Sequence, residues 1–133
     1  MDSLALWRRD SLRVGPAGKI LVVEDRDKPY ERILEALKDD FDLVREPDPA
    51  SAARRVPDGD FDLLIISLNL AHADGLRLCA QVRSLDRIRH LPILIVDESG
   101  DDRRWLRGLD MGVNDYIVCP IDGNELPARM PPR

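Results

Sequence analysis

The chain contains four short runs of apolar or aromatic residues, at positions 20–23, 63–66, 93–96 and 116–118. The runs do not alternate with polar residues, and they are rich in Ile, Val and Leu, which is typical of parallel strands buried on both faces of a sheet. A more polar segment at 41–46 is predicted to be an edge strand. The pattern therefore predicts a sheet of five strands.

Amphipathic segments separate the predicted strands, and several begin at an aspartate that can cap a helix. Asp27, Asp48 and Asp74 occupy such positions. In the helix that follows Asp74, the spacing predicts that Cys79 and Ala80 lie on the buried face. Cys79 is then a small core residue.

The last predicted helix begins near Asp122 and is expected to be short or disrupted. Pro127 falls where backbone donors are first needed, and continuing a regular helix there costs roughly 3 kcal/mol or more. We therefore expect one domain at 19–126, preceded by an arm or interdomain linker at 1–18 and followed by a proline-rich tail at 127–133.

Strands and helices alternate along this domain. Such alternation indicates βαβ units with right-handed crossovers and a parallel sheet covered by helices on both faces. A chain of 133 residues is long enough for one such domain with a real core. The fold class is predicted to be α/β.

Composition argues against several partners. The net charge of -5 and the pI near 5.0 give no general attraction to a phosphate backbone. Two cysteines, Cys79 and Cys119, are too few and too far apart for a disulfide framework or a zinc site. No apolar run approaches the length of a membrane span, and the first residues carry charges where a signal peptide is apolar. We expect a cytoplasmic protein with no nucleic-acid or membrane partner.

The residues that follow the buried strands are predicted to converge in space. They are Glu24, Asp25, Ser67, Asp97 and Cys119. Parallel strands place these residues at one edge of the sheet, and the carboxyl edge is where α/β proteins bind ligands. Three carboxylates at this edge are hard oxygen ligands, so a divalent-cation site is one interpretation.

A hydrolase triad is another interpretation of the same edge. Ser67, His72 and Asp74 supply the residue types that such a triad needs. However, Ile66 and Leu68 flank the serine where a nucleophile elbow has glycines. The sequence therefore gives the hydrolase interpretation little support.

Several motifs occur in a characteristic order along the chain. They are the acidic pair Glu24-Asp25, the turn Asp74-Gly75, the segment Leu91-Pro92-Ile93, the segment Gly112-Val113-Asn114-Asp115-Tyr116 and the segment Pro120-Ile121-Asp122. On these motifs, residues 19–126 resemble a receiver domain of two-component response regulators, and most of all the second receiver of PleD-type diguanylate cyclases. The resemblance implies a flavodoxin-like, three-layer α/β/α fold with strand order 2-1-3-4-5. It also implies that an aspartate on the third strand accepts a phosphoryl group from a histidine kinase, assisted by magnesium.

Three positions that perform this chemistry differ from the family pattern. Ser67 replaces the phosphoacceptor aspartate, Asp97 replaces the switch hydroxyl residue, and Cys119 replaces the lysine. A serine hydroxyl without an activating base is a weak nucleophile. The three acids Glu24, Asp25 and Asp97 sum to -3, whereas the family's three acids and one lysine sum to -2. A phosphoryl donor would therefore meet a more negative pocket without its cation.

Other family positions are retained. Glu24 and Asp25 match the magnesium-binding acids, Asn69 matches the residue whose backbone carbonyl assists them, and Tyr116 matches the aromatic switch. Because the third carboxylate is missing at Ser67, we expect at most a weak, vestigial Mg²⁺ site and no other cofactor. Tyr116 is expected to be a fixed packing residue.

These features predict a non-catalytic, non-phosphorylatable pseudo-receiver that serves as an adaptor or dimerisation module in two-component signalling. The expected setting is a PleD-like regulator with an attached output domain, and the expected partner is another receiver domain or a second copy. A divalent-cation or small-ligand sensor using the acidic cleft is the alternative, and a Ser-dependent hydrolase is the third. The residues expected at the pairing face are Arg103, Arg104, Arg107, Asp115 and Asp122.

Overall fold

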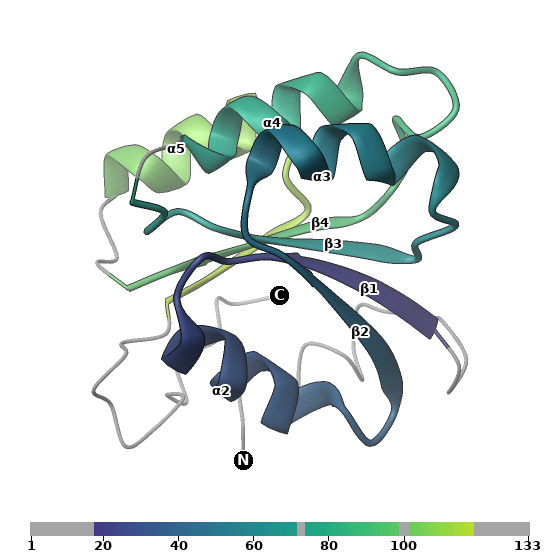
Figure 1. The fold of residues 1–133 in the computed structure, drawn as a ribbon. Coiled ribbons are helices and arrows are strands. Elements are labelled where there is room, and N and C mark those ends of the chain that lie inside the picture. The colour runs from purple at the N-terminus through teal and green to yellow at the C-terminus, as the bar shows by residue number, and fades with distance from the viewer. Residues whose placement is uncertain (1–17, 72–73, 99–101, 119–133) are drawn as a thin grey trace.

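A five-stranded sheet forms the centre of the domain. The computed structural model of the protein describes residues 18–71, 74–98 and 102–118, with the backbone alone at 102, 104, 105 and 115. All neighbouring strands are parallel, and their order is β2-β1-β3-β4-β5. The strands are β1 (Gly18–Val23), β2 (Phe41–Glu46), β3 (Leu63–Ser67), β4 (Ile93–Asp97) and β5 (Asp115–Val118). The predicted strand positions and order are confirmed (Figure 1).

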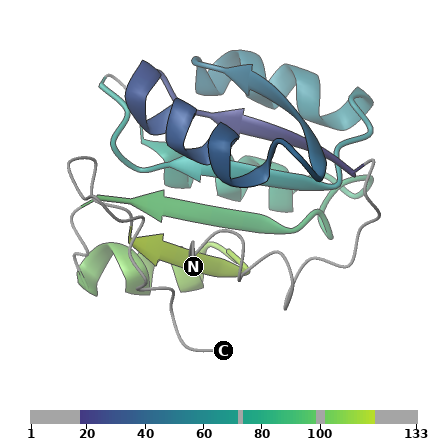
Figure 2. The same cartoon turned by 90° about the horizontal axis from the view of Figure 1, so that it is seen from below.

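Helices lie on both faces of this sheet. They are α2 (Asp27–Leu37), α3 (Pro49–Arg55), the short 3-10 helix η1 (Val56–Asp58), α4 (Gly75–Arg83) and α5 (Asp102–Asp110). Helices α3, α4 and α5 cover one face, and α2 lies against the other (Figures 1 and 2). This is the predicted three-layer α/β/α arrangement. None of the helices in the described ranges is long and apolar enough to cross a membrane.

Some predictions concern segments outside the described residues. They are residues 1–17 of the arm predicted at 1–18, whose last residue, Gly18, begins β1, together with the helix expected from Asp122 and the tail at 127–133. These remain predictions from the sequence.

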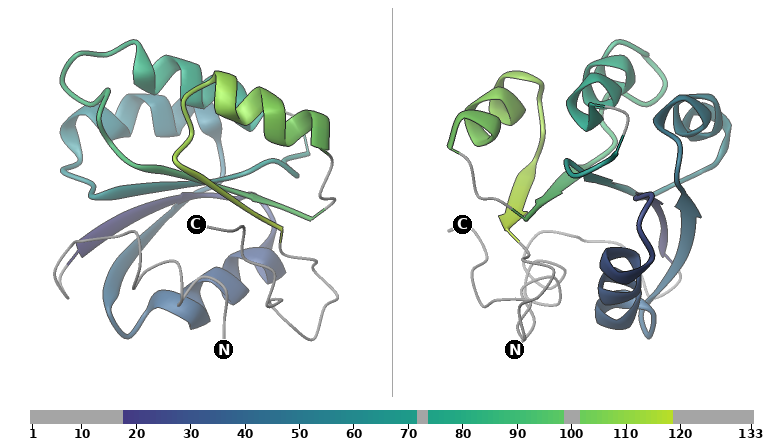
Figure 3. Two further views of the ribbon diagram at one scale, coloured as in Figure 1. Left: turned by 180° about the vertical axis from the view of Figure 1, so that it is seen from behind. Right: turned by 60° about the vertical axis from the view of Figure 1, so that its left-hand side comes forward.

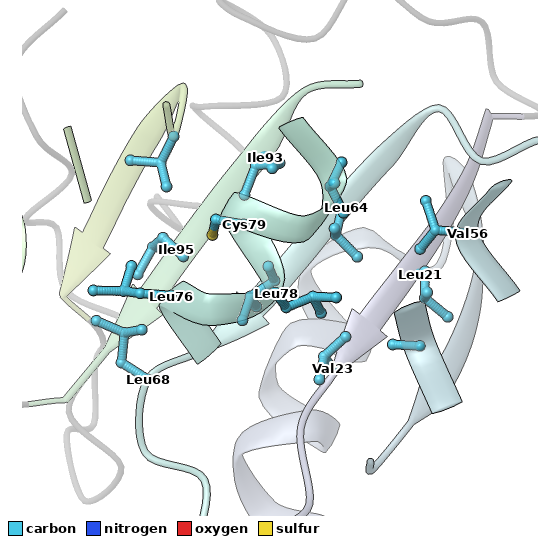
Figure 4. Close-up of a cluster of buried hydrophobic side chains, with 14 of the residues drawn as sticks. Leu21, Val23, Val56, Leu64, Leu68, Leu76, Leu78, Cys79, Ile93 and Ile95 are labelled. Atoms are coloured by element: carbon cyan, nitrogen blue, oxygen red, sulfur yellow. The ribbon is translucent and has the colours of Figure 1, made fainter. Parts of the chain in front are cut away.

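Each face of the sheet has its own apolar core. Strand residues alternate between the two cores, so that Leu21 and Leu64 face α3 and α4 while Ile20 and Ile65 face α2. The core beneath α4 is shown in Figure 4. Cys79 lies in it with no exposed surface, as predicted, and burial raises the pKa of its thiol to about 12. Such a thiol is unreactive at neutral pH.

The buried face of α4 contains Cys79. Leu78 and Val82 are buried on the same face, whereas Ala80 is exposed. The prediction that Ala80 is buried was therefore wrong, because the helix is rotated so that Ala80 lies beyond the edge of the contact with the sheet.

Two of the three predicted helix caps are confirmed. Asp48 accepts hydrogen bonds from the backbone N–H groups of Ala50 and Ser51, and Asp74 accepts one from Leu76. Asp27 does not cap α2, because the helix begins at Asp27 itself and Arg26 is the N-cap residue. The Asp27 carboxylate instead forms an ion pair with Arg45 at 2.8 Å.

Arg83 joins α4 to the connection that precedes β4 and to the connection that precedes β5. Its guanidinium donates to the carbonyls of Arg89, Leu91 and Gly112 and to the side chain of Asn114, at 2.7–3.0 Å. Asn114 also accepts a hydrogen bond from the N–H of Ile93 at the start of β4. One side chain therefore holds α4 and the beginnings of β4 and β5 together.

Helix α5 lies at the end of its layer, with α4 on one side (Figure 3). Two of its leucines are largely exposed, Leu106 at 59% and Leu109 at 49%. Helix α5 therefore keeps an apolar stripe that the described residues do not cover.

Candidate functional site

Three polar side chains lie buried at the carboxyl edge of the sheet. Glu24 follows β1, Ser67 ends β3 and Asp97 ends β4, and these three strands are neighbours in the centre of the sheet. Their exposed fractions are 1%, 2% and 0%. The predicted convergence of Glu24, Ser67 and Asp97 is confirmed, whereas Cys119 lies outside the described residues.

Ser67 is held by the loop that follows it. Its hydroxyl oxygen accepts the N–H of Asn69 at 3.1 Å. Ser67 is 2% exposed, and its side chain lies near the Glu24 carboxylate, where it acts to lower the pKa of that carboxyl. The hydroxyl is therefore buried and accepts a hydrogen bond within the protein.

The hydrolase arrangement receives no support from Asp74. Its carboxylate caps α4 through Leu76, and it also pairs with Arg107 at 3.2 Å. His72 lies outside the described residues. Asp74 therefore has a structural role at the start of the helix.

Glu24 is the most deeply buried acid of the β1 connection. Burial raises the pKa of its carboxyl above the ordinary value, although the hydrogen bonds and charge of Arg26, and the nearby Ser67 hydroxyl, act in the opposite direction. The backbone N–H of Arg26 donates to Glu24 Oε2 at 3.2 Å, and Arg26 Nη2 lies 3.4 Å from Glu24 Oε1. The carboxylate is thus turned toward Arg26.

Arg26 bridges two connections of the fold. Its Nη2 also lies 2.7 Å from Glu98 Oε2, directly after β4. Burial lowers the pKa of Arg26, but hydrogen bonds and charges of Glu98 and Glu24 outweigh burial and raise it. Neither Arg26 nor Glu98 was singled out from the sequence. The run Glu-Asp-Arg-Asp at 24–27 was a signal that a cation accompanies these acids.

The remaining acid, Asp25, points toward the β3 connection. Its Oδ2 accepts the N–H of Ala71 at 2.9 Å, while its Oδ1 is buried without a hydrogen-bond partner among the described residues. The side chain of Asn69 accepts the N–H of Glu98 at 3.0 Å. Asn69 therefore joins the ends of β3 and β4 through its side chain.

The residues present do not fit a magnesium ion. In the described ranges, no group of three His, Cys, Asp or Glu side chains is placed to hold a metal ion. Asp25 Oδ1 is one available oxygen, but Glu24 is engaged by Arg26 and Ser67 supplies no carboxylate. Magnesium requires near-octahedral oxygen coordination, which this arrangement does not offer.

Asp97 and Tyr116 form a buried pair. The Tyr116 hydroxyl donates to Asp97 Oδ2, and Tyr116 itself is 4% exposed. Tyr116 lies opposite Ile95 on the neighbouring strand, so the bond joins β5 to the end of β4. The role of Tyr116 as a fixed packing residue stays a prediction.

The residues predicted for a pairing face are only partly described. Arg103 and Arg107 are exposed on α5, and Arg107 forms the ion pair with Asp74. The side chains of Arg104 and Asp115, and all of Asp122, lie outside the described part of the chain.

Replacing Glu24 by Gln tests whether burial dominates at this acid. Because the pKa of Glu24 is raised above 4.5 in the folded protein, the fold retains a proton that the unfolded chain has released just above that pH. The free energy of unfolding therefore falls as pH rises through this range. We expect Glu24→Gln to be at least as stable as the wild type at neutral pH, with the difference shrinking toward pH 4.5.

Urea unfolding across this pH range measures the effect, with the exposed Glu31→Gln on α2 as the control. The control is expected to follow the wild type at every pH. A loss of more than about 1 kcal/mol in Glu24→Gln at neutral pH, the size of a typical hydrogen bond, would show that the ion pair outweighs burial.

Comparison with known proteins places this fold. A family model described as "Response regulator receiver domain" matches residues 20–130. The response regulator PleD of Caulobacter vibrioides (strain NA1000 / CB15N) is 36% identical over 116 residues, which cover 87% of this chain and 25% of the relative. The response regulator ArlR of Staphylococcus saprophyticus is 34% identical over 113 residues, covering 84% of this chain and 50% of the relative. The phosphorylated cyanobacterial phytochrome response regulator RcpA superposes with a TM-score of 0.71 at 25% identity, over 80% of this chain and 83% of that structure.

A parallel sheet in the order 2-1-3-4-5, with acids gathered at its carboxyl edge, is the flavodoxin-like arrangement of receiver domains. The chain belongs to the response regulator receiver domain family. It spans about a quarter of the length of PleD and about half of the length of ArlR.

Proposed function

We propose that this receiver domain is a pseudo-receiver, which works as a non-catalytic adaptor or dimerisation module in two-component signalling. The observation that carries the proposal is Ser67 at the end of β3, 2% exposed and hydrogen-bonded to the backbone N–H of Asn69. A phosphoacceptor must present a free carboxylate at this place, and Ser67 presents a neutral, engaged hydroxyl. The buried bond between Tyr116 and Asp97 further supports a site with one fixed arrangement.

The proposed setting is a larger cytoplasmic regulator with an output domain, of the PleD-like diguanylate cyclase kind. The likeness to PleD supports this setting, as does the share of each relative that the chain covers. In such a regulator the domain would transmit a signal through contact with another domain, without phosphorylation of its own.

The proposed contact surface is the exposed face of α5. Leu106 and Leu109 form its apolar stripe, and Arg103, Arg107 and Asp110 lie exposed on the same helix. Charges of both signs on one helix allow an antiparallel copy to place an arginine opposite an aspartate. The proposed occupant is a second receiver domain, in the simplest case a second copy of this chain. Apolar contact provides most of the affinity, because exposed ion pairs contribute only about 0–1 kcal/mol each.

Leu106→Glu with Leu109→Glu is expected to weaken association by about tenfold or more, because both changes put charge into the apolar centre of the contact. Sedimentation at rising concentration, alone and with a companion receiver, measures the association. Leu85→Glu is the matched control, since Leu85 is also exposed but lies just beyond the C-terminal end of α4.

Association is expected to be the same with and without acetyl phosphate. A strictly monomeric protein in both settings would contradict the pairing role. The same holds for association that the paired leucine substitutions leave unchanged.

A further inference from the structure

Arg26 is the arginine that pairs with the buried Glu24 carboxylate at the carboxyl edge of the sheet. Its guanidinium lies between carboxylates of two different connections, 3.4 Å from Glu24 Oε1 and 2.7 Å from Glu98 Oε2. Its Nε lies a further 3.5 Å from Glu24 Oε2, and its backbone N–H donates to the same oxygen. The side chain and the backbone of Arg26 therefore contact both carboxylate oxygens of Glu24.

The Glu24 carboxylate is far more deeply buried than Arg26 and Glu98, its neighbours in this cluster. Glu24 is 1% exposed, Glu98 is 23% exposed and Arg26 is 32% exposed at the side chain. A buried carboxylate needs a counter-charge, and the loss of that partner leaves an uncompensated charge inside the protein. Arg26 provides the counter-charge from a position that still reaches solvent, where a dissolved cation would otherwise enter.

A side chain has an advantage over a dissolved ion at such a place. Arg26 is two residues from Glu24, so its guanidinium is always present at high effective concentration. A divalent cation must displace it and must also give up part of its own hydration shell, which magnesium does reluctantly.

We propose that Arg26 is the resident cation of this site, which excludes divalent cations and fixes the β1–α2 connection against the β4–α5 connection. The inference goes beyond the pairing role of α5 and does not rest on it, because α5 supplies none of the groups involved.

The third connection is fixed in the same way. Ala71, after β3, donates its N–H to Asp25, and Asn69 accepts the N–H of Glu98. All three connections at this edge are therefore joined by bonds within the protein. The edge has one arrangement whether or not magnesium is present in solution.

Substitution of Arg26 by a neutral residue removes the counter-charge of Glu24 and Glu98. The oxygens of these two carboxylates then become available to a dissolved cation. Arg26→Ala and Arg26→Gln remove the charge, while Arg26→Lys retains it. Arg89→Ala makes the same change of charge at an exposed residue of the connection between α4 and β4, at the opposite edge of the sheet.

Calorimetric titration of each variant with MgCl₂ alone and with MnCl₂ alone is the test, after circular dichroism has shown that the variant is folded. The wild type, Arg26→Lys and Arg89→Ala are expected to show no binding. Arg26→Ala and Arg26→Gln are expected to bind measurably, about tenfold or more above the detection limit that the wild type does not reach, since a unit charge a few ångströms away acts strongly near a protein surface.

Two outcomes would overturn the inference. One is a wild type that binds either ion as tightly as the neutral variants, and the other is folded neutral variants without any gain in affinity. A measurement on the wild type covers the case in which neither neutral variant folds. The NMR signal of the Arg26 Nε–H group is expected to stay in place on addition of MgCl₂, and its displacement would show that the ion takes the place of the side chain.

Discussion

We expect acetyl phosphate with magnesium to leave the mass of this protein unchanged. Phosphoryl transfer depends on positioning and on electrostatic stabilisation of the transferring group. Ser67 is buried and accepts a hydrogen bond from the N–H of Asn69, and the carboxylate of Glu24 at the end of the neighbouring strand is engaged by Arg26. Intact-mass spectrometry under conditions that label a functional receiver is the measurement. A functional receiver labelled in the same tube is the positive control.

Ser67→Asp alone is expected to give little phosphoryl labelling. Ser67→Asp places a further negative charge beside Glu24 and Asp97, and no lysine is supplied at Cys119. The triple variant Ser67→Asp, Asp97→Thr and Cys119→Lys should gain label, because it restores the acceptor, the hydroxyl and the cation together. A stable phosphoryl group on the wild type that disappears in Ser67→Ala would refute the pseudo-receiver interpretation.

Gly75→Ala is expected to cost about 1–3 kcal/mol of unfolding free energy, the range for an overpacked core. Gly75 begins α4, and a Cβ there would lie 2.7 Å from Ile66 Cγ2 and 2.7 Å from the backbone oxygen of Ser67. The methyl group of Ile66 could rotate away, but the Ser67 carbonyl belongs to β3. Helix α4 must therefore move off the strand that carries the site.

Gly108→Ala is the matched control for this substitution. Gly108 lies in α5, and a Cβ there would lie 3.2 Å from a methyl group of Val113, which is a side chain and not backbone. A gain of about 0.5–1 kcal/mol in helix propensity offsets that contact, so the control should remain close to the wild type. Urea unfolding measures both variants. Equal stability of Gly75→Ala and the wild type would show that the start of α4 is free to shift.

The strands could be predicted because their sequences leave little choice. A run such as residues 63–66 has no polar position to turn toward water, so both of its faces must be covered, and short helices between such runs impose parallel order. The family motifs then fixed the order of the strands. Position along a strand also predicted which residues reach the carboxyl edge.

The partners at that edge could not be predicted in the same way. Arg26 forms an ion pair with Glu98, which lies far along the chain. The connections that follow β1 and β4 come together only because β1, β3 and β4 lie in this order in the sheet. Asp27 was misassigned as a cap for a related reason, since helix α2 begins one residue earlier than the aspartate pattern indicated. Local sequence patterns specify elements, whereas the direction of a loop side chain depends on neighbours that are remote in sequence.

The hydrogen bonds of Arg83 have a mechanical consequence for signalling by contact. Four bonds fasten the guanidinium to the connections before β4 and β5, so α4 cannot slide along the sheet without breaking them. The opposite end of α4 is also held, because Gly75 packs directly against Ile66 and the carbonyl oxygen of Ser67. Both ends of α4 are therefore attached to the sheet, so that this helix and the strand that carries Ser67 move together.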